Sequence, residues 1–257
     1  MDLPRNRFKA AIGAMQPQVG LWCTIDDTQV TEMVAGAGFD WLMFDIEHTG
    51  LDENSVLRHL QAAAPSGVST MVRPRSLDPA EIKKLLDLGV QTLLIPYVQT
   101  PEEAALAAAS VTYPPEGIRG VAAGSRASGF GRIADYAARA RDEICLLVQV
   151  ETAATLPQIE AIAAVPGVDG MFVGPADLAA SMGHPGNPRH PEVRAAIVDA
   201  ISRIRAAGKP PGFLSLDPEL MAAAREAGAV FTCPMIDKAA LMQGLAGVLP
   251  DRGALGA

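Results

Sequence analysis

Three ionisable side chains occur within four residues of the segment DWLMFDIEHTG (40–50), directly after a hydrophobic run typical of a buried strand. Of Asp45, Glu47 and His48, we expect His48 to act as a general base, because the ordinary pKa of imidazole lies nearest to neutral pH. Asp45 and Glu47 are two residues apart and therefore lie on one face of an extended chain. We expect these two acids to organise the waters of a metal ion or the side chain of Arg73.

Further polar groups stand at the ends of other apolar segments. Arg73 ends the segment STMVR, and Gln149 and Glu151 share one face at the end of CLLVQVE. Asp177 begins the helix expected after GMFVGP. In a barrel of parallel strands the carboxyl ends surround one mouth, so we expect these groups to form a single site. The alternative for any one of them is a purely structural role.

Two of these acids form a candidate metal site. Glu151 and Asp177, on different segments, would with water make an oxygen-rich site for a hard divalent cation with positions left open for substrate oxygens. Mg²⁺ or Mn²⁺ fits this donor set, whereas a structural zinc site would need Cys or His beside the acids. The alternative is that both acids are helix caps or ion-pair partners, because a helix start attracts an acid in any case.

The segment GPAD adds a device for holding a substrate. The backbone N–H groups of Ala176 and Asp177, at a helix N-terminus, could hold a carboxylate beside the metal. A 2-oxo acid could then bind the cation through its keto and carboxylate oxygens. Arg73 could neutralise the charge that develops on the keto oxygen as an enolate forms.

Other chemistries find little support. An imine-forming aldolase needs a lysine in the barrel mouth, and only Lys238 follows an expected strand, where the first turn of the last helix is predicted. There is no GxSxG, Walker or HExxH motif, and no glycine-rich phosphate cradle follows the last two expected strands. His184 and His190 are expected to be loop polar groups or a helix entry, and His59 a surface or structural residue.

The elements that must position these residues alternate regularly. Eight short and mostly apolar segments are expected to be parallel strands buried on both faces, at 20–25, 41–47, 69–74, 92–98, 145–151, 170–175, 211–215 and 230–236. Ala-rich helical segments lie between them, and Asp52, Asp78-Pro79 and Thr100-Pro101 are predicted helix starts. The alternation predicts a (β/α)8 barrel. A doubly wound sheet is the alternative, but no GxGxxG turn follows the first strand.

One connection, from Thr112 to Arg141, is too long for an ordinary crossover and contains two prolines, five glycines and five arginines. A loop of this length is often functional, the alternative being a surface excursion or a subunit contact. No internal repeat or linker is evident, so a single domain over residues 1–257 is expected.

Composition excludes several classes of partner. The net charge of −8 and the pI near 5.0 disfavour nucleic acid and anionic membranes, which require basic surfaces. Cys23, Cys145 and Cys233 are widely spaced in apolar segments and are expected to be buried, reduced thiols. Neither a signal peptide nor a transmembrane span is recognisable, so the cytoplasm is the expected compartment.

Several segments together resemble the metal-dependent class II pyruvate aldolases of the 4-hydroxy-2-oxoheptanedioate aldolase (HpcH/HpaI aldolase/citrate lyase) family. They extend in order from about residue 6 to residue 245: GLW, AGAGFDWLMFDIEH, VRP, LLDLGVQTLLIPYVQ, YPPEGIRGV, LLVQVET, GVDGMFVGPADLAASMG and GNPRHPEV. The resemblance implies a (β/α)8 TIM barrel of the phosphoenolpyruvate/pyruvate-binding type with a Mg²⁺, Mn²⁺ or Co²⁺ site. It also implies reversible cleavage of 4-hydroxy-2-oxo acids to pyruvate, or hydroxypyruvate, and an aldehyde through a metal-bound enolate. A homo-hexamer (a trimer of dimers) with active sites near subunit interfaces is implied as well.

The resemblance assigns roles to individual residues. His48 resembles the catalytic base, Arg73 the enolate-stabilising arginine, and Asp87 the acid that pairs with the base. From the residues alone Asp87 is a helix-surface residue; the resemblance overrules that, and a subunit contact would explain it. The remaining matches are the metal ligands Glu151 and Asp177, the substrate contacts Gln149, Gly174, Pro175, Ala176 and Asp177, and the pocket-wall residue Trp22.

Three segments depart from the family pattern. They are CTIDDTQV with two acids, GVAAGSRASGFGR with Phe130 where tryptophan is common, and EHTGLD after the second expected strand. These departures are expected to affect the aldehyde, or the donor substituent, and to leave the chemistry intact. The alternative functions are a CoA-thioester lyase of the citrate lyase β type and a non-catalytic 2-oxo-acid sensor on the same barrel.

Overall fold

The computed structural model describes residues 1–248 of the 257-residue chain. Eight parallel strands close into a barrel in sequence order, with β1 pairing with both β2 and β8. The strands β1 to β8 are Gln18–Cys23, Trp41–Asp45, Ser69–Arg73, Thr92–Ile95, Cys145–Val150, Gly170–Val173, Pro211–Leu214 and Phe231–Cys233. The predicted (β/α)8 barrel is confirmed. The prediction of one domain over 1–257 stays a prediction, because residues 249–257 lie outside the described residues.

All eight expected strands are present, but they end earlier than predicted. The strand expected at 41–47 ends at Asp45, and the strand expected at 92–98 ends at Ile95. The strand expected at 145–151 ends at Val150. Glu47 and Glu151 therefore lie beyond the ends of β2 and β5 and not within these strands.

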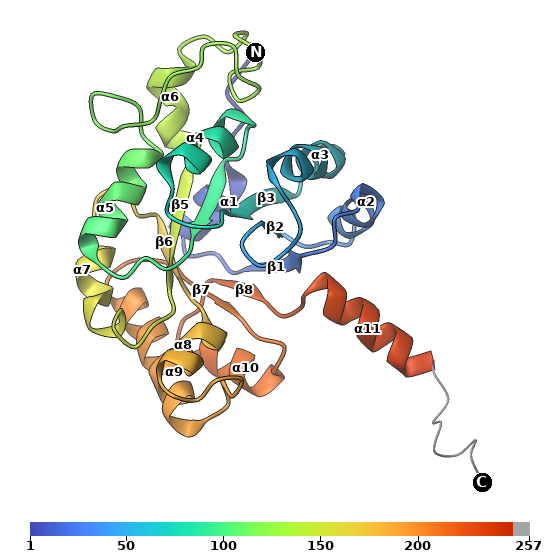
Figure 1. Cartoon of the computed structure of the whole chain (residues 1–257), viewed down its shortest axis with the longest axis vertical. Helices are drawn as coiled ribbons and strands as arrows, with labels where there is room; N and C mark the ends of the chain where they lie inside the picture. The colour runs from blue at the N-terminus through green and yellow to red at the C-terminus, as the bar shows by residue number, and fades with distance from the viewer. Residues whose placement is uncertain (249–257) are drawn as a thin grey trace.

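Helices surround the barrel (Figure 1). The helices α1 to α11 are Arg7–Gly13, Thr28–Ala35, Glu53–Ala63, Pro79–Asp87, Pro101–Ser110, Tyr136–Glu143, Ile159–Ala163, Pro175–Ser181, Pro191–Ala206, Pro218–Glu226 and Asp237–Val248. Two short 3₁₀ helices, η1 (Ala64–Ser66) and η2 (Leu156–Gln158), precede β3 and α7. No described helix is long and apolar enough to cross a membrane.

The predicted helix starts are confirmed by their hydrogen bonds. Asp52 accepts a bond from the backbone N–H of Ser55 at the start of α3, and Asp78 accepts one from Ala80 at the start of α4. Thr100 and Glu103 form a reciprocal capping box at the start of α5. Each cap satisfies backbone donors that the first helical turn leaves without intrahelical partners.

Large side chains fill the barrel interior, and glycines make room for them. A Cβ at Gly20 would lie 2.0 Å from the ring of Trp41, and one at Gly212 would lie 2.2 Å from the ring of Phe231. Phe8 of α1 packs against Phe231 with ring centroids 5.5 Å apart, so α1 closes the amino-terminal end of the barrel. Cys23, Cys145 and Cys233 are buried and free, as predicted.

The long connection after α5 ends earlier than expected, because α6 begins at Tyr136. Arg119 lies buried within it, with its guanidinium carbon 4.4 Å from the ring centroid of Tyr113 and 5.7 Å from that of Tyr136. Nη2 of Arg119 donates to Asp87 at the end of α4 over 3.0 Å. The connection is therefore a loop that is attached to α4 through the ion pair of Arg119 with Asp87.

Helix α11 leaves the barrel and extends away from it (Figure 1). Asp237, in its first turn, is the one buried residue of this helix. Its carboxylate accepts bonds from the backbone N–H groups of Thr24 (2.8 Å) and Ile25 (2.9 Å), which ties the start of α11 to the loop after β1. The rest of α11 exposes Leu241, Met242, Leu245 and Val248.

Candidate active site

Arg73, at the end of β3, is the centre of the polar groups in the barrel mouth. Its Nε and Nη2 donate to the two carboxylate oxygens of Asp45 over 3.0 and 2.7 Å, a bidentate pair between neighbouring strand ends. Its Nη1 lies 2.9 Å from Glu47 and 3.4 Å from the amide oxygen of Gln149. The guanidinium carbon also lies 4.8 Å from the ring centroid of Trp22. The structure thus brings together predicted residues from four strands.

Asp45 holds this arrangement in place. Besides Arg73, its carboxylate accepts bonds from Nε1 of Trp22 (3.2 Å) and from the backbone N–H of Glu47 (3.0 Å). Burial raises the pKa of Asp45, but the hydrogen bonds and the charge of Arg73 outweigh it, and the net pKa is lowered. Asp45 is therefore a carboxylate at neutral pH that orients Arg73.

Glu151, directly after β5, is fixed at both of its oxygens. Oε2 accepts a bond from Nε2 of Gln149 (2.7 Å), and Oε1 accepts one from the backbone N–H of Tyr97 (2.6 Å). Tyr97 has a φ of 56°, in the left-handed region, where a residue other than glycine is uncommon. The role of Tyr97 was not predicted from the sequence, because it contributes a backbone N–H group and residue type does not indicate such a contribution.

Gly174, which precedes α8, makes room for Glu151. A Cβ at this position would lie 2.8 Å from Oε2 of Glu151 and 3.2 Å from Nε2 of Gln149. Pro175 occupies the first turn of α8, and Gly174 offers no capping side chain. The backbone N–H groups of Ala176 and Asp177 lie in the same first turn, where helical geometry provides no intrahelical acceptor.

Four carboxyl groups of the barrel mouth, those of Asp45, Glu47, Glu151 and Asp177, affect one another's ionisation. Burial raises the pKa of Glu151 to about 7, with the charges of Glu47 and Asp177 adding to the shift. The pKa of Glu47 is also raised, first by burial and further by Asp45 and Asp177, although Arg73 and His48 oppose it. Oε2 of Glu47 is buried, and Nη1 of Arg73 lies 2.9 Å from it as an ion-pair partner. Buried, mutually repelling oxygens of this kind are the donor set that a hard divalent cation prefers.

His48 lies at the rim of the site, with 63% of its side chain exposed. Its Nε2 is 3.6 Å from Oε2 of Glu47. Asp87 is bonded to Arg119 of its own chain. The predicted pairing of Asp87 with His48 is therefore not formed within one chain, and it stays a prediction.

The acids that distinguish the segment after β1 have structural roles. Asp27 caps α2 by accepting bonds from the backbone N–H groups of Gln29 (2.8 Å) and Val30 (3.1 Å). Asp26 lies 3.2 Å from Nε2 of His59 and accepts a bond from Ser55 over 2.8 Å. The side chain of Asp27 thus caps α2, and that of Asp26 contacts residues of α3.

Comparison with known proteins identifies relatives over nearly the whole chain. The family described as HpcH/HpaI aldolase/citrate lyase matches residues 18–242. A hydroxypyruvate/pyruvate aldolase of Sagittula stellata is 58% identical over 92% of this chain and 94% of its own. A 4-hydroxy-2-oxo-heptane-1,7-dioate aldolase of Klebsiella pneumoniae is 50% identical over 93% of this chain and 91% of its own. A crystal structure of a family member from Burkholderia cenocepacia superposes with a TM-score of 0.91 at 36% identity, covering 94% of this chain and 97% of that one.

Proposed function

The chain belongs to the HpcH/HpaI aldolase/citrate lyase family, and we propose that it is a divalent-metal-dependent aldolase. Its substrates are 4-hydroxy-2-oxo acids, which it reversibly cleaves to pyruvate, or hydroxypyruvate, and an aldehyde. The observation that carries this proposal is the position of Arg73. Its guanidinium is fixed by Asp45 and lies among Glu47, Gln149 and Glu151, where an oxyanion would be flanked by a fixed positive charge.

The residues at the mouth fit a divalent cation. Glu151 and Asp177 are the proposed ligands, with Glu47 and Asp45 positioning waters and Arg73 around them. The raised pKa values of the Glu47 and Glu151 carboxyl groups and the space that Gly174 leaves beside Glu151 support this assignment. When bound, such a cation would polarise the keto group of the substrate and stabilise negative charge on its oxygen.

Different protein groups contact different parts of a bound 2-oxo acid. The N–H groups of Ala176 and Asp177 hold its carboxylate at the start of α8. Arg73 donates to the keto oxygen as it becomes negative during C3–C4 cleavage. Gln149 lies between Arg73 and Glu151 and fixes both relative to the substrate.

His48 moves the proton. As general base it removes the proton from the 4-hydroxyl group while the C3–C4 bond breaks to give the aldehyde and the pyruvate enolate. The protonated imidazole then delivers a proton to C3 of the enolate, which gives pyruvate, and the reverse direction removes a methyl proton of pyruvate and later protonates the new alkoxide. Its exposure leaves room for a partner that orients the ring, and we assign that role to Asp87 of a second copy of the chain. This arrangement requires an oligomer, and a homo-hexamer acting in the cytoplasm is the proposed state.

Exchange of the methyl protons of pyruvate with deuterated solvent tests the enolate chemistry separately from the choice of aldehyde. We expect exchange with Mg²⁺ or Mn²⁺ present, and a loss of about 10²–10⁴-fold in H48Q, the range typical of a general base. R73K should also lose activity, because lysine cannot make the bidentate pair with Asp45. Exchange at an undiminished rate after chelation of metal would contradict the proposal.

A screen of aldehydes then defines the acceptor. Pyruvate and hydroxypyruvate would each be combined with succinic semialdehyde, glyceraldehyde and lactaldehyde, and aldol product would be measured by chromatography. Product formation with at least one pair is expected. Tight binding of pyruvate with neither exchange nor product would instead indicate a sensor.

A further inference from the structure

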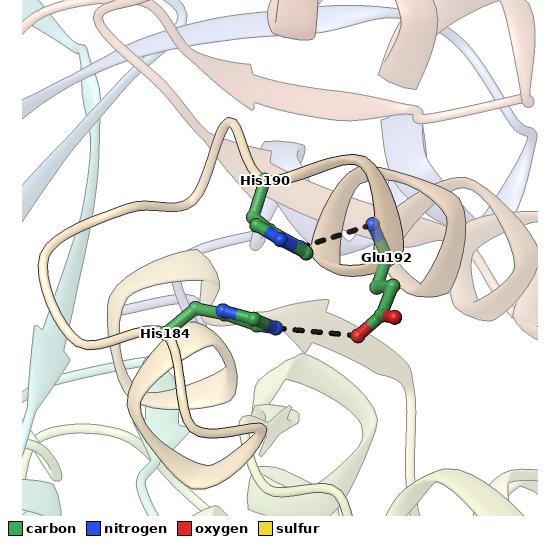
Figure 2. Close-up of side chains that lie close together, drawn as sticks. All are labelled: His184, His190 and Glu192. Carbon is green, nitrogen blue, oxygen red and sulfur yellow. Dashed lines mark hydrogen bonds and ion pairs between the residues drawn. The ribbon is translucent and has the colours of Figure 1, made fainter.

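A second cluster of side chains that could bind a metal lies where the segment after α8 enters the first turn of α9. His184, His190 and Glu192 converge there (Figure 2), and their candidate ligand atoms all lie within 4.8 Å of one another. None of the three belongs to the group around Arg73. We propose that they form a second divalent-metal site, one that takes a transition ion such as Zn²⁺ or Ni²⁺.

The local fold holds the two imidazoles together. His184 follows the end of α8, where its backbone N–H donates to Ala179 over 2.8 Å. His190 is the N-cap of α9, and its Nδ1 accepts a bond from the backbone N–H of Glu192 over 3.3 Å. Backbone bonds from Asn187 to His184 (3.0 Å) and from His190 to Asn187 (3.1 Å) fold the intervening residues into turns. The two rings consequently stack with centroids 3.5 Å apart and planes 14° apart.

The donor set differs from that of the barrel mouth and selects a different ion. Two imidazoles and one carboxylate are ligands typical of Zn²⁺ and other transition ions, whereas Mg²⁺ prefers oxygen alone. The carboxylate of Glu192 already lies 3.2 Å from Nε2 of His184. Because 72% of the Glu192 side chain and 25% of the His184 side chain are exposed, an ion can enter from solvent and keep water as a further ligand.

Metal binding requires only side-chain rotation. An ion must lie near the plane of each ring, at a nitrogen lone pair, so the stacked rings must tilt apart about their side-chain torsions. Two contacts would be replaced by bonds to the ion. They are the contact between His184 and Glu192 and the hydrogen bond by which His190 caps α9, which at 3.3 Å is long. The bound ion would then link the end of α8 to the start of α9.

Zinc titration in excess Mg²⁺ tests the site in the wild-type protein, with calorimetry counting the equivalents bound and thermal unfolding reporting stabilisation. We expect H184Q and H190N each to bind one equivalent of Zn²⁺ fewer than wild type, or to bind it at least about tenfold more weakly. Asparagine at 190 keeps the helix cap while it removes the imidazole. D199N, which changes an exposed carboxylate on the same helix, should behave as wild type.

Zinc binding that is equal in wild type, H184Q and H190N would overturn the proposal, as would the absence of a saturable equivalent in wild type at micromolar protein concentration. Circular dichroism of each variant verifies that the fold is retained. In E151Q/D177N, which lacks the proposed barrel ligands, the same equivalent should remain. The site does not rest on the proposed function, because proton exchange in Mg²⁺ is measured independently and either result can fail alone.

Discussion

At the scale of single residues, the pair of Asp45 and Arg73 links stability to chemistry. Both side chains are buried, and each ion has its partner in bidentate geometry. Such a pair contributes little net stability over apolar residues of equal size, but removing one partner leaves a buried charge without compensation. The pair therefore fixes the position of the guanidinium, as the role proposed for Arg73 requires.

We expect D45N to destabilise the protein by about 3–5 kcal/mol, the usual cost of breaking a buried ion pair. The free energy of unfolding would be measured by urea denaturation, together with the rate of pyruvate proton exchange, which should also fall. E160Q is the matched control, because it breaks the exposed pair of Glu160 with Arg203 and should cost less than about 1 kcal/mol. Equal effects of the two substitutions would show that burial of the pair is unimportant.

Gly174 provides a residue-scale test of the metal assignment. Its φ is −90°, so alanine is compatible with the backbone, but the added Cβ would meet Oε2 of Glu151 at 2.8 Å. We expect G174A to weaken Mn²⁺ or Mg²⁺ binding by roughly 10- to 100-fold, as for other changes next to metal ligands. Isothermal titration calorimetry measures the affinity, and G124A, where a Cβ would meet nothing within 4 Å, is the control. Unchanged affinity in G174A would argue against Glu151 as a ligand.

At the scale of elements, His59 joins α2, α3 and the loop after β1. Its Nδ1 lies 2.6 Å from the hydroxyl of Thr31 on α2, and its Nε2 lies 3.2 Å from Asp26. Its ring stacks on Phe44 of β2, with centroids 5.1 Å apart. Burial lowers the pKa of His59, although Asp26 opposes the shift. The ring is thus neutral in the native protein at neutral pH, and it is structural, one of the two roles expected from sequence.

This environment predicts a pH dependence of stability. The unfolded chain takes up a proton at His59 near its ordinary pKa of 6.5, whereas the native protein takes it up only at lower pH. The stabilising contribution of His59 to the free energy of unfolding is therefore complete above pH 6.5 and is lost as the pH falls below this value. We expect the free energy of unfolding of wild type to decrease between about pH 7.5 and 5.5, and H59Q to be less stable at pH 7.5 but to lose less on acidification. Parallel losses in both proteins would assign the effect to other groups.

At the scale of the whole molecule, two features of the single chain lack an expected contact: the apolar side of α11 is uncovered, and His48 does not meet Asp87. Helix α11 exposes Leu241, Met242 and Leu245 away from the barrel, and exposed apolar clusters of this kind usually mark contact surfaces. His48 lacks a contact with Asp87 within its own chain. Assembly of several copies would complete both, which supports the proposed homo-hexamer.

We expect the double substitution L241E/L245E to reduce the molecular mass in solution, because it places charges on the exposed apolar side of α11. Size-exclusion chromatography with light scattering measures the mass. Q243E, which adds one charge to another exposed position of the same helix, should leave the assembly intact. A wild-type protein that is monomeric, or a double variant that retains the wild-type mass, would refute this role of α11.

The barrel and most polar groups of its mouth were predictable from sequence for physical reasons. Parallel strands buried on both faces require continuous apolar segments, so Cys145–Val150 is recognisable and the acid that follows it stands out. Helix caps are recognisable because Asp and Thr side chains satisfy specific backbone donors. The strand ends were placed too late because residue type does not reveal where a ladder stops.

The amino-acid sequence by itself determined the barrel, the order of its strands and the polar residues gathered at their ends, because these depend on local periodicity and residue type. Only the tertiary structure decided which of those residues touch. It placed Arg73 between Asp45 and Trp22, directed the backbone N–H of Tyr97 at Glu151, and joined Asp87 to Arg119. It also stacked His184 on His190. Such contacts depend on the packing of elements far apart in the chain, and no short segment of sequence encodes them.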